Sequence, residues 1–193
     1  MSEALNGDFV PAAPAAIVLA AGAGRRMGGR PKSLLLRDGQ TLLARQIQVL
    51  HAAGVRRVVV VLGHHAPAIE AALRPLAAEL GLAQGALGWV RNPAPDLGPG
   101  SSLRAGLAAL PEGGDVLVAL ADQPLLAPPD VVALLQAWRG RRAGCELLVP
   151  MHAGTPGHPV VFSPAVRAAV QRLGGGEGVR EWRRAHPAQV QWL

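Results

Sequence analysis

Hydrophobic and polar positions along this chain form two kinds of pattern, and the strands and helices that these patterns predict alternate. Continuous apolar runs rich in valine, leucine and alanine are typical of strands that are covered on both faces of a sheet. Apolar residues three or four positions apart are typical of helices that pack on such a sheet. The runs predict strands at residues 15–20, 57–62, 87–91, 116–120, 146–149, 159–162 and 189–192. The spacing predicts helices at residues 41–53, 66–80, 101–110, 128–139, 164–173 and 179–185.

Cap residues and proline mark several ends of these elements. Thr41 suits the N-cap of the helix over residues 41–53, and Gly54 suits its C-terminal end. Pro128 opens another helix, because proline is tolerated in the first helical turn. Strands that alternate with helices indicate an α/β fold with a mostly parallel sheet covered on both faces. In such folds, ligands bind outside the carboxyl ends of the strands.

The length and the single cysteine place the chain in a broad class. Its 193 residues suit a single domain over residues 15–193, and we expect the alanine- and proline-rich residues 1–14 to be a disordered extension. That extension lacks the basic and apolar regions of a secretory signal. No apolar run approaches the roughly 18 residues that cross a bilayer, so we expect no membrane partner. Cys145 excludes an internal disulfide, and we expect a cytoplasmic protein with this residue in its core.

The charge balance favours a small anionic substrate. The chain carries 19 Lys and Arg against 13 Asp and Glu, a net charge of +6 that would raise the rate of encounter with anions. Aromatic residues make up only 3% of the chain and tyrosine is absent, which leaves few side chains for stacking on single-stranded bases. We therefore expect no nucleic acid partner.

Lys32 is the only lysine among the 19 basic residues. It lies in the glycine-rich segment of residues 22–32, directly after the predicted strand at residues 15–20. A lysine ammonium is a compact, mobile point charge, whereas an arginine guanidinium is a rigid planar fork. Glycine-rich turns after strands are also where phosphates are held. The placement predicts that Lys32 contacts the phosphates of a substrate, with Arg26 supplying further charge.

The glycine spacing departs from two familiar phosphate-binding motifs. Gly28 follows Gly22 and Gly24 one residue later than the third glycine of the GxGxxG dinucleotide fingerprint. Lys32 lacks the helix-opening GK[ST] context of the Walker loop. A nicotinamide-dependent oxidoreductase is therefore a less favoured hypothesis than an enzyme that binds a polyphosphate.

Two more loops follow predicted strands and should meet the first at one edge of the sheet. Asp122 comes just after the strand at residues 116–120, where a carboxylate can cap a turn or bind Mg²⁺ together with substrate phosphates. Beside a polyphosphate loop we favour the metal interpretation. Ser101 can be a helix N-cap, or it can join Asn92 and Ser102 in binding a base or ribose.

The histidines do not suggest a zinc site. His64 and His65 are adjacent, and His152 and His158 are six residues apart, whereas a helical zinc site uses an i, i+4 pair. We interpret His64 and His65 as the start of a helix or the rim of a pocket.

Four segments, in this order, resemble those of molybdenum cofactor cytidylyltransferases and their close relatives among the nucleotidyltransferases. They are LAAGAGRRMGGRPKSLL at residues 19–35, VRNPAPDLGPGSSLRAGL at 90–107, ALADQPLL at 119–126 and GTPGHPVVF at 154–162. The resemblance spans residues 15–185. It implies a Rossmann-like, three-layer nucleotide-diphospho-sugar transferase fold with a mixed sheet of about seven strands.

The resemblance also implies roles for individual residues. Nucleotide binding is implied for Leu19, Ala20, Ala21, Gly22, Gly24, Arg25, Lys32, Asn92, Ser101 and Ser102. Catalytic roles are implied for Lys32, Arg26 and Asp122, Mg²⁺ binding for Asp122 and Glu177, and binding of the second substrate for Gly157, His158 and Pro159. The Glu177 assignment rests on a departure, because the family shows Gly-Asp-x-Gly-Ala-Arg where this chain has Gly-Glu-Gly-Val-Arg at residues 176–180.

The function that the resemblance implies is Mg²⁺-dependent transfer of CMP from CTP to the phosphate of a molybdopterin-type cofactor, with release of pyrophosphate. Ala21 resembles the cytidylyl-transferring members, since guanylyl-transferring relatives typically carry glycine there. One alternative is guanylyl or another nucleotidyl transfer to a related phosphate acceptor. Another is a non-catalytic carrier or chaperone that hands the cofactor to a molybdoenzyme apo-protein.

Overall fold

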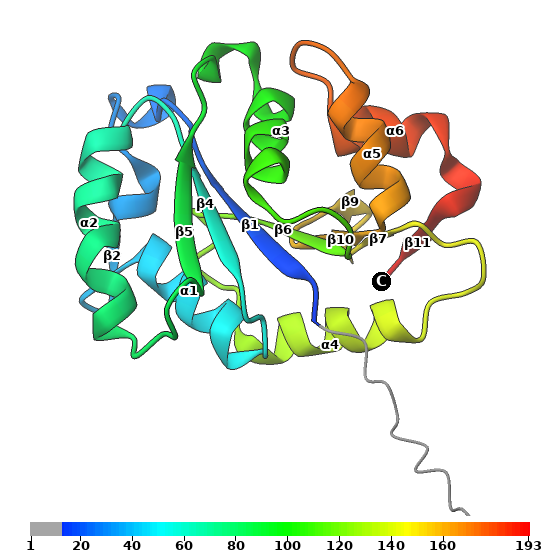
Figure 1. Ribbon diagram of the computed structural model, residues 1–193, viewed down its shortest axis with the longest axis horizontal. Helices are drawn as coiled ribbons and strands as arrows, with labels where there is room; N and C mark the ends of the chain where they lie inside the picture. The colour runs from blue at the N-terminus through cyan, green and yellow to red at the C-terminus, as the bar shows by residue number, and fades with distance from the viewer. Residues whose placement is uncertain (1–12) are drawn as a thin grey trace, which may run out of the picture.

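The computed structural model describes residues 13–193, apart from the side chain of Arg26, and arranges them as a sheet between two layers of helices (Figure 1). The main sheet has seven strands in the order β11-β7-β10-β6-β1-β4-β5. The predicted α/β fold with a mixed sheet is confirmed. Residues 1–12, which make up most of the predicted disordered extension, lie outside the described part of the chain.

The elements of the sheet and its helices follow the predicted ones closely. The strands are β1 (Ala15–Ala20), β4 (Val58–Leu62), β5 (Leu87–Arg91), β6 (Val116–Leu120), β7 (Leu147–Val149), β10 (Val160–Phe162) and β11 (Val190–Trp192). The α-helices are α1 (Leu42–Ala52), α2 (Ala66–Glu79), α3 (Pro99–Ala109), α4 (Pro128–Arg139), α5 (Pro164–Arg172) and α6 (Val179–Ala185). Thr41 caps α1 as predicted, because its hydroxyl accepts a hydrogen bond from the Ala44 backbone N–H at 3.1 Å.

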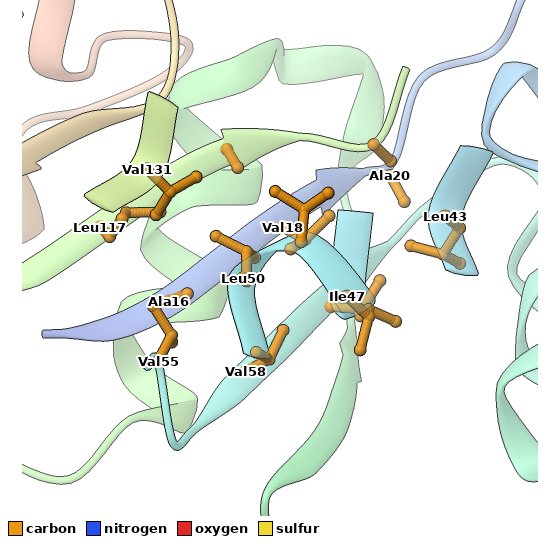
Figure 2. Packing of buried hydrophobic residues seen from close by; sticks show 14 of the residues in the cluster. Ala16, Val18, Ala20, Leu43, Ile47, Leu50, Val55, Val58, Leu117 and Val131 are labelled. Carbon is orange, nitrogen blue, oxygen red and sulfur yellow. The ribbon is translucent and has the colours of Figure 1, made fainter. Parts of the chain in front are cut away.

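Residues of β1 alternate between the two faces of the sheet. Ala16 and Val18 belong to an apolar cluster with α1, α2 and α4, whereas Ile17 belongs to a second cluster with α3, α5 and α6. Figure 2 shows the first cluster, in which Ile47 and Leu50 of α1 pack beside the strands. Covering on both faces explains why the strands are continuous apolar runs in the sequence. Within residues 13–193, no helix has the length and apolar character needed to cross a membrane.

Two short hairpins lie outside the main sheet, and the hydrophobic pattern does not predict them. They are β2 (Leu36–Arg37) with β3 (Gln40–Thr41), and β8 (Met151–His152) with β9 (Thr155–Pro156). Strands of two residues are too short to show an alternating period. The turn of the first hairpin, with Asp38 at φ 53° and Gly39 at φ 79°, is an Asp-Gly turn that could have revealed it.

Strand direction brings the loops of interest to one edge of the sheet. β1 runs parallel to β4 and β6, and β4 runs parallel to β5. β10 runs antiparallel to β6 and β7. The loops that follow β1, β4, β5 and β6 therefore lie at the same edge as the segment that precedes β10.

Candidate active site

A cleft of about 560 Å³ opens at this edge of the sheet. The glycine-rich loop after β1 forms one wall, and the loop that follows β6 forms another. The loop between β5 and α3 contributes as well. Of the residues assigned to nucleotide binding by resemblance, those that line the cleft are Leu19, Ala20, Ala21, Gly22, Gly24, Arg25, Lys32 and Ser102.

Lys32 and Asp122 face each other inside this cleft. Lys32 follows Pro31 at the start of the 3₁₀ helix η2 (Lys32–Leu34), and Asp122 follows the end of β6. The Lys32 ammonium lies 3.8 Å from the Asp122 carboxylate, and the two side chains are 40% and 39% exposed. The sheet thus brings together two charges that are 90 residues apart in the sequence and leaves both open to a ligand.

The glycine-rich loop is closed by Gly24. This residue has φ 65° and precedes the 3₁₀ helix η1 (Arg25–Met27). A Cβ at this position would overlap the backbone carbonyl oxygen of Arg30, so only glycine fits the turn. The Gly24 carbonyl accepts hydrogen bonds from the N–H groups of Met27 and Gly29 at 2.8 and 3.2 Å. Arg26 lies in η1, and its predicted phosphate contact falls outside the described side chains.

Asp96 links the two sides of the cleft, a feature that the sequence pattern does not reveal. It lies in the 3₁₀ helix η3 (Pro95–Leu97), and its Oδ1 is 3.1 Å from Arg25 Nη2 and 3.4 Å from His64 Nε2. His64 lines the cleft, as one of the two interpretations of the histidine pair predicts. The Asp96 carboxylate thus lies among cationic and polar groups that also face the cleft.

Asn92 and Ser101 do not line the cleft. Their side chains are buried, and the Asn92 amide donates hydrogen bonds to the hydroxyls of Ser101 and Ser102 at 2.9 and 3.0 Å. The Ser101 hydroxyl is also 2.8 Å from the carbonyl oxygen of Gly98. The N-cap interpretation of Ser101 is wrong, because α3 begins at Pro99, whose missing N–H suits the first turn. These residues brace the loop behind the cleft.

The predicted second-substrate segment, residues 157–159, lines two further cavities of about 620 and 430 Å³. Asp122 borders the larger of these as well as the cleft. His158 borders both cavities. Burial lowers the pKa of His158 below its usual 6.5, and the charge of Arg183 lowers it further, while Asp122 acts in the opposite direction. At neutral pH the imidazole is therefore uncharged.

Glu177 lines neither the cleft nor the two cavities, although its neighbours Gly176 and Gly178 line the smaller cavity. It is exposed and is not among the residues that line the cleft around Asp122. Its backbone carbonyl accepts a hydrogen bond from Arg104 of α3 at 2.8 Å, and a Cβ at Gly100 would overlap that same oxygen. The segment that carries Glu177 is therefore docked on α3 through its backbone. Among residues 13–193, no three His, Cys, Asp or Glu side chains cluster closely enough to enclose a metal ion.

A family model described as the MobA-like NTP transferase domain matches residues 16–190. This chain belongs to that family. Membership makes the chain a nucleotidyltransferase that uses a nucleoside triphosphate. The expected family is thereby confirmed, while the nucleotide and the acceptor stay open.

Three similar proteins illustrate how varied the relatives of this MobA-like chain are. Nicotine blue oxidoreductase of Paenarthrobacter nicotinovorans is 36% identical over 92% of this chain and 82% of its own length. The bifunctional protein GlmU of a Polaromonas species is 32% identical, over 90% of this chain but only 36% of GlmU. The crystal structure of Rv0371c from Mycobacterium tuberculosis has a TM-score of 0.72 and 29% identity, and covers 94% of this chain and 87% of Rv0371c.

Proposed function

We propose that this chain transfers CMP from CTP to the terminal phosphate of a molybdopterin-type cofactor and releases pyrophosphate. The observation that carries the proposal is the Lys32–Asp122 pair, 3.8 Å apart in a cleft of about 560 Å³ beside a glycine-rich loop. A cleft of this size is within the range for small-molecule sites. An ammonium and a carboxylate side by side suit a phosphate group and the cation that accompanies it.

In the proposed reaction, a phosphate oxygen of the acceptor attacks the α-phosphorus of the nucleotide. A new phosphorus–oxygen bond forms as the bond from the α-phosphorus to the bridging oxygen breaks, and the electron pair leaves with pyrophosphate. No protein nucleophile is required, because the attacking phosphate is already anionic. The chain's own residues position the reactants and neutralise charge, as in other phosphoryl-transfer sites. Lys32 would offset the negative charge that develops on the leaving group.

Mg²⁺ is the cation that the proposal assigns to this cleft, with Asp122 as its protein ligand. Magnesium is held in proteins by one or two carboxylates together with substrate phosphates and water, and Asp122 is a half-exposed carboxylate with room around it. When bound there, the cation would supply positive charge that stabilises the phosphate groups of the nucleotide. A solved structure of Rv0371c, 27% identical to this chain with a TM-score of 0.70, is described as a complex with manganese, which supports a divalent cation here.

The acceptor is proposed to bind beside residues 157–159, which line the two additional cavities, and the larger of these cavities adjoins Asp122. Delivery of the product to a molybdoenzyme apo-protein and a cytoplasmic location belong to the same proposal. Cys145, which is buried and free, suits a reducing compartment.

A pyrophosphate-release assay tests the function. The purified chain is incubated with a molybdopterin-type cofactor, Mg²⁺ and either CTP or GTP. Release that requires both the cofactor and Mg²⁺ and is faster with CTP is the expected result. Faster release with GTP would assign the chain to guanylyl transfer. Cofactor binding that needs no Mg²⁺, without any pyrophosphate release, would identify a carrier and overturn the proposed reaction.

The second candidate function is that of an oxidoreductase that reduces its substrate with a nicotinamide cofactor. It is favoured by the 36% identity to a protein named nicotine blue oxidoreductase over 92% of this chain. The spacing of Gly22, Gly24 and Gly28 argues against it, because a dinucleotide site uses GxGxxG. Titration with NADH separates the two functions, since binding changes NADH fluorescence. No change in fluorescence eliminates this candidate, whereas binding together with oxidation of NADH by nicotine blue would replace the first proposal.

A further inference from the structure

Gln123, next to Asp122, connects the loop after β6 with the segment before β10 through one side chain. Its amide oxygen accepts a hydrogen bond from the Leu120 backbone N–H at 3.2 Å. Its amide nitrogen donates to the backbone carbonyl of His158 at 2.9 Å. The first bond fixes the loop after β6, and the second crosses to the segment before β10. The hydrogen bond from Gln123 to His158, 35 positions apart in the sequence, thus connects these two loops. We call this hydrogen bond the tie.

The two loops that Gln123 joins serve different parts of the site. Asp122 contributes to the cleft that it shares with Lys32. His158 contributes to the two cavities assigned to the acceptor. The larger cavity is lined by Asp122, Gln123 and His158 together. The Gln123 side chain therefore restrains the distance between the proposed cation ligand and the proposed acceptor segment, in addition to the pairing of β6 with β10.

Side chains of α1 and β2 hold the backbone of Gln123 and its neighbour in place. Gln46 of α1, which is only 1% exposed, donates a hydrogen bond from its amide nitrogen to the Gln123 carbonyl oxygen. Arg37 of β2 donates to the carbonyl oxygen of Pro124. A buried donor has few alternative partners, so the bond from Gln46 restricts how far the loop can move. The hydrogen bond from Gln123 to His158 therefore starts from a loop whose backbone is restrained.

The two hydrogen bonds of the Gln123 side chain require both a donor and an acceptor. Gln123 accepts from one backbone N–H and donates to one backbone carbonyl, and only a side chain with both a donor and an acceptor can do so. Glutamate has the same length, but it would turn a carboxylate oxygen toward the His158 carbonyl. Leucine could make neither bond, and asparagine is one methylene shorter.

We infer that Gln123 is a positioning residue that holds the acceptor segment at a fixed distance from Asp122. The inference rests on the proposed function for the identity of the two ligands, but the tie itself can be measured without them. A role of this kind affects binding and turnover of the acceptor and leaves the nucleotide cleft intact. A merely structural role would weaken both substrates together.

The test uses Gln123→Glu and Gln123→Leu in the full chain, with Gln136→Glu as the matched control, because Gln136 is exposed on α4. Hydrogen exchange at the backbone amides of residues 157, 158, 160 and 161 reports how often the segment that Gln123 holds opens. Both Gln123 variants should raise this exchange about tenfold, the equivalent of one lost hydrogen bond. The control should exchange as the wild type does. Wild-type exchange in Gln123→Glu would overturn the inference.

Kinetics with CTP, Mg²⁺ and the molybdopterin-type cofactor then test the positioning role. In both Gln123 variants the KM for the cofactor should rise and kcat should fall, each by about tenfold. In Gln123→Glu, whose carboxylate can still accept from the Leu120 N–H, the dissociation constant of CTP should change less than about twofold. Equal losses for both substrates would contradict positioning. A wild type without transfer activity would overturn the proposed function, and the exchange experiment would still decide whether the tie exists.

Discussion

At the scale of single residues, the ammonium of Lys32 is the group whose chemistry an arginine could not reproduce. We expect Lys32→Arg to lower turnover about a hundredfold, the usual cost of losing one preorganised group of about 3 kcal/mol. The rigid fork of arginine retains the charge but cannot follow a phosphate as a compact ammonium does. Stability should hardly change, because ion pairs this exposed contribute roughly 0–1 kcal/mol. Pyrophosphate release and thermal unfolding measure the two effects.

Arg30→Lys is the matched control for this substitution. Arg30 lies in the same loop, is exposed and does not line the cleft. Its exchange for lysine should leave turnover unchanged. Full activity in Lys32→Arg would remove the functional meaning of the lone lysine.

His158 should make the stability of the protein depend on pH. Burial holds its folded-state pKa below 6.5, so below that pH the unfolded chain binds a proton that the folded chain does not. Stability should therefore fall as the pH decreases from 6.5 to the lowered pKa. His158→Gln should lose less stability than the wild type between pH 7.5 and 5.5 in urea unfolding. His152→Gln, at an exposed position, should behave as the wild type, and equal losses in all three proteins would contradict this account.

At the scale of elements, Arg167 of α5 holds the C-terminal end of α3. This residue is 6% exposed, and its guanidinium donates to the carbonyl oxygens of Leu107, Leu110, Pro111 and Gly113 at 2.6 to 3.2 Å. Arg167→Met would leave these acceptors without their shared donor. We expect a loss of about 3 kcal/mol, which would lower Tm by roughly 6 to 12 °C in differential scanning calorimetry.

Arg172→Met controls for the general loss of an arginine from α5. Arg172 lies in the last turn of this helix and is exposed, so Tm should change by less than about 2 °C. Similar losses in both variants would show that the contacts of Arg167 do not set the stability.

The elements themselves could be predicted where hydrophobic period and length agree. The strand at residues 58–62 is a run of buried apolar residues, and the sequence shows it plainly. The start of α3 could not be placed, because Ser101 looks like an N-cap but uses its hydroxyl inside the first turn. The local preference of serine favours an N-cap at residue 101. In the structure, Ser101 instead lies inside the first turn of α3, where its hydroxyl accepts a hydrogen bond from Asn92.

At the scale of the whole molecule, parallel strands explain why part of the site could be predicted. Lys32 and Asp122 each follow a strand, and the rule that carboxyl ends converge brings them to one edge without any alignment. The rule says nothing about contacts between loops. The bridge from Asp96 to Arg25 spans 71 residues and depends on side-chain conformation, so composition and spacing carry no signal for it. The same reason hides the tie between Gln123 and His158.

A ligand that occupies the whole cleft should stabilise the entire chain. CTP at a hundred times its dissociation constant adds about 2.7 kcal/mol, which should raise Tm by roughly 5 to 11 °C. This rise should require Mg²⁺, because without the cation the Asp122 carboxylate would repel the negatively charged triphosphate. Asp122→Asn should lose the Mg²⁺-dependent part, whereas Glu112→Gln, exposed outside the cleft, should keep it. A full shift without Mg²⁺ would mean that CTP binds without the cation, and an undiminished shift in Asp122→Asn would mean that the cation is held elsewhere. Either result would show that the Lys32–Asp122 pair is not the centre of the site.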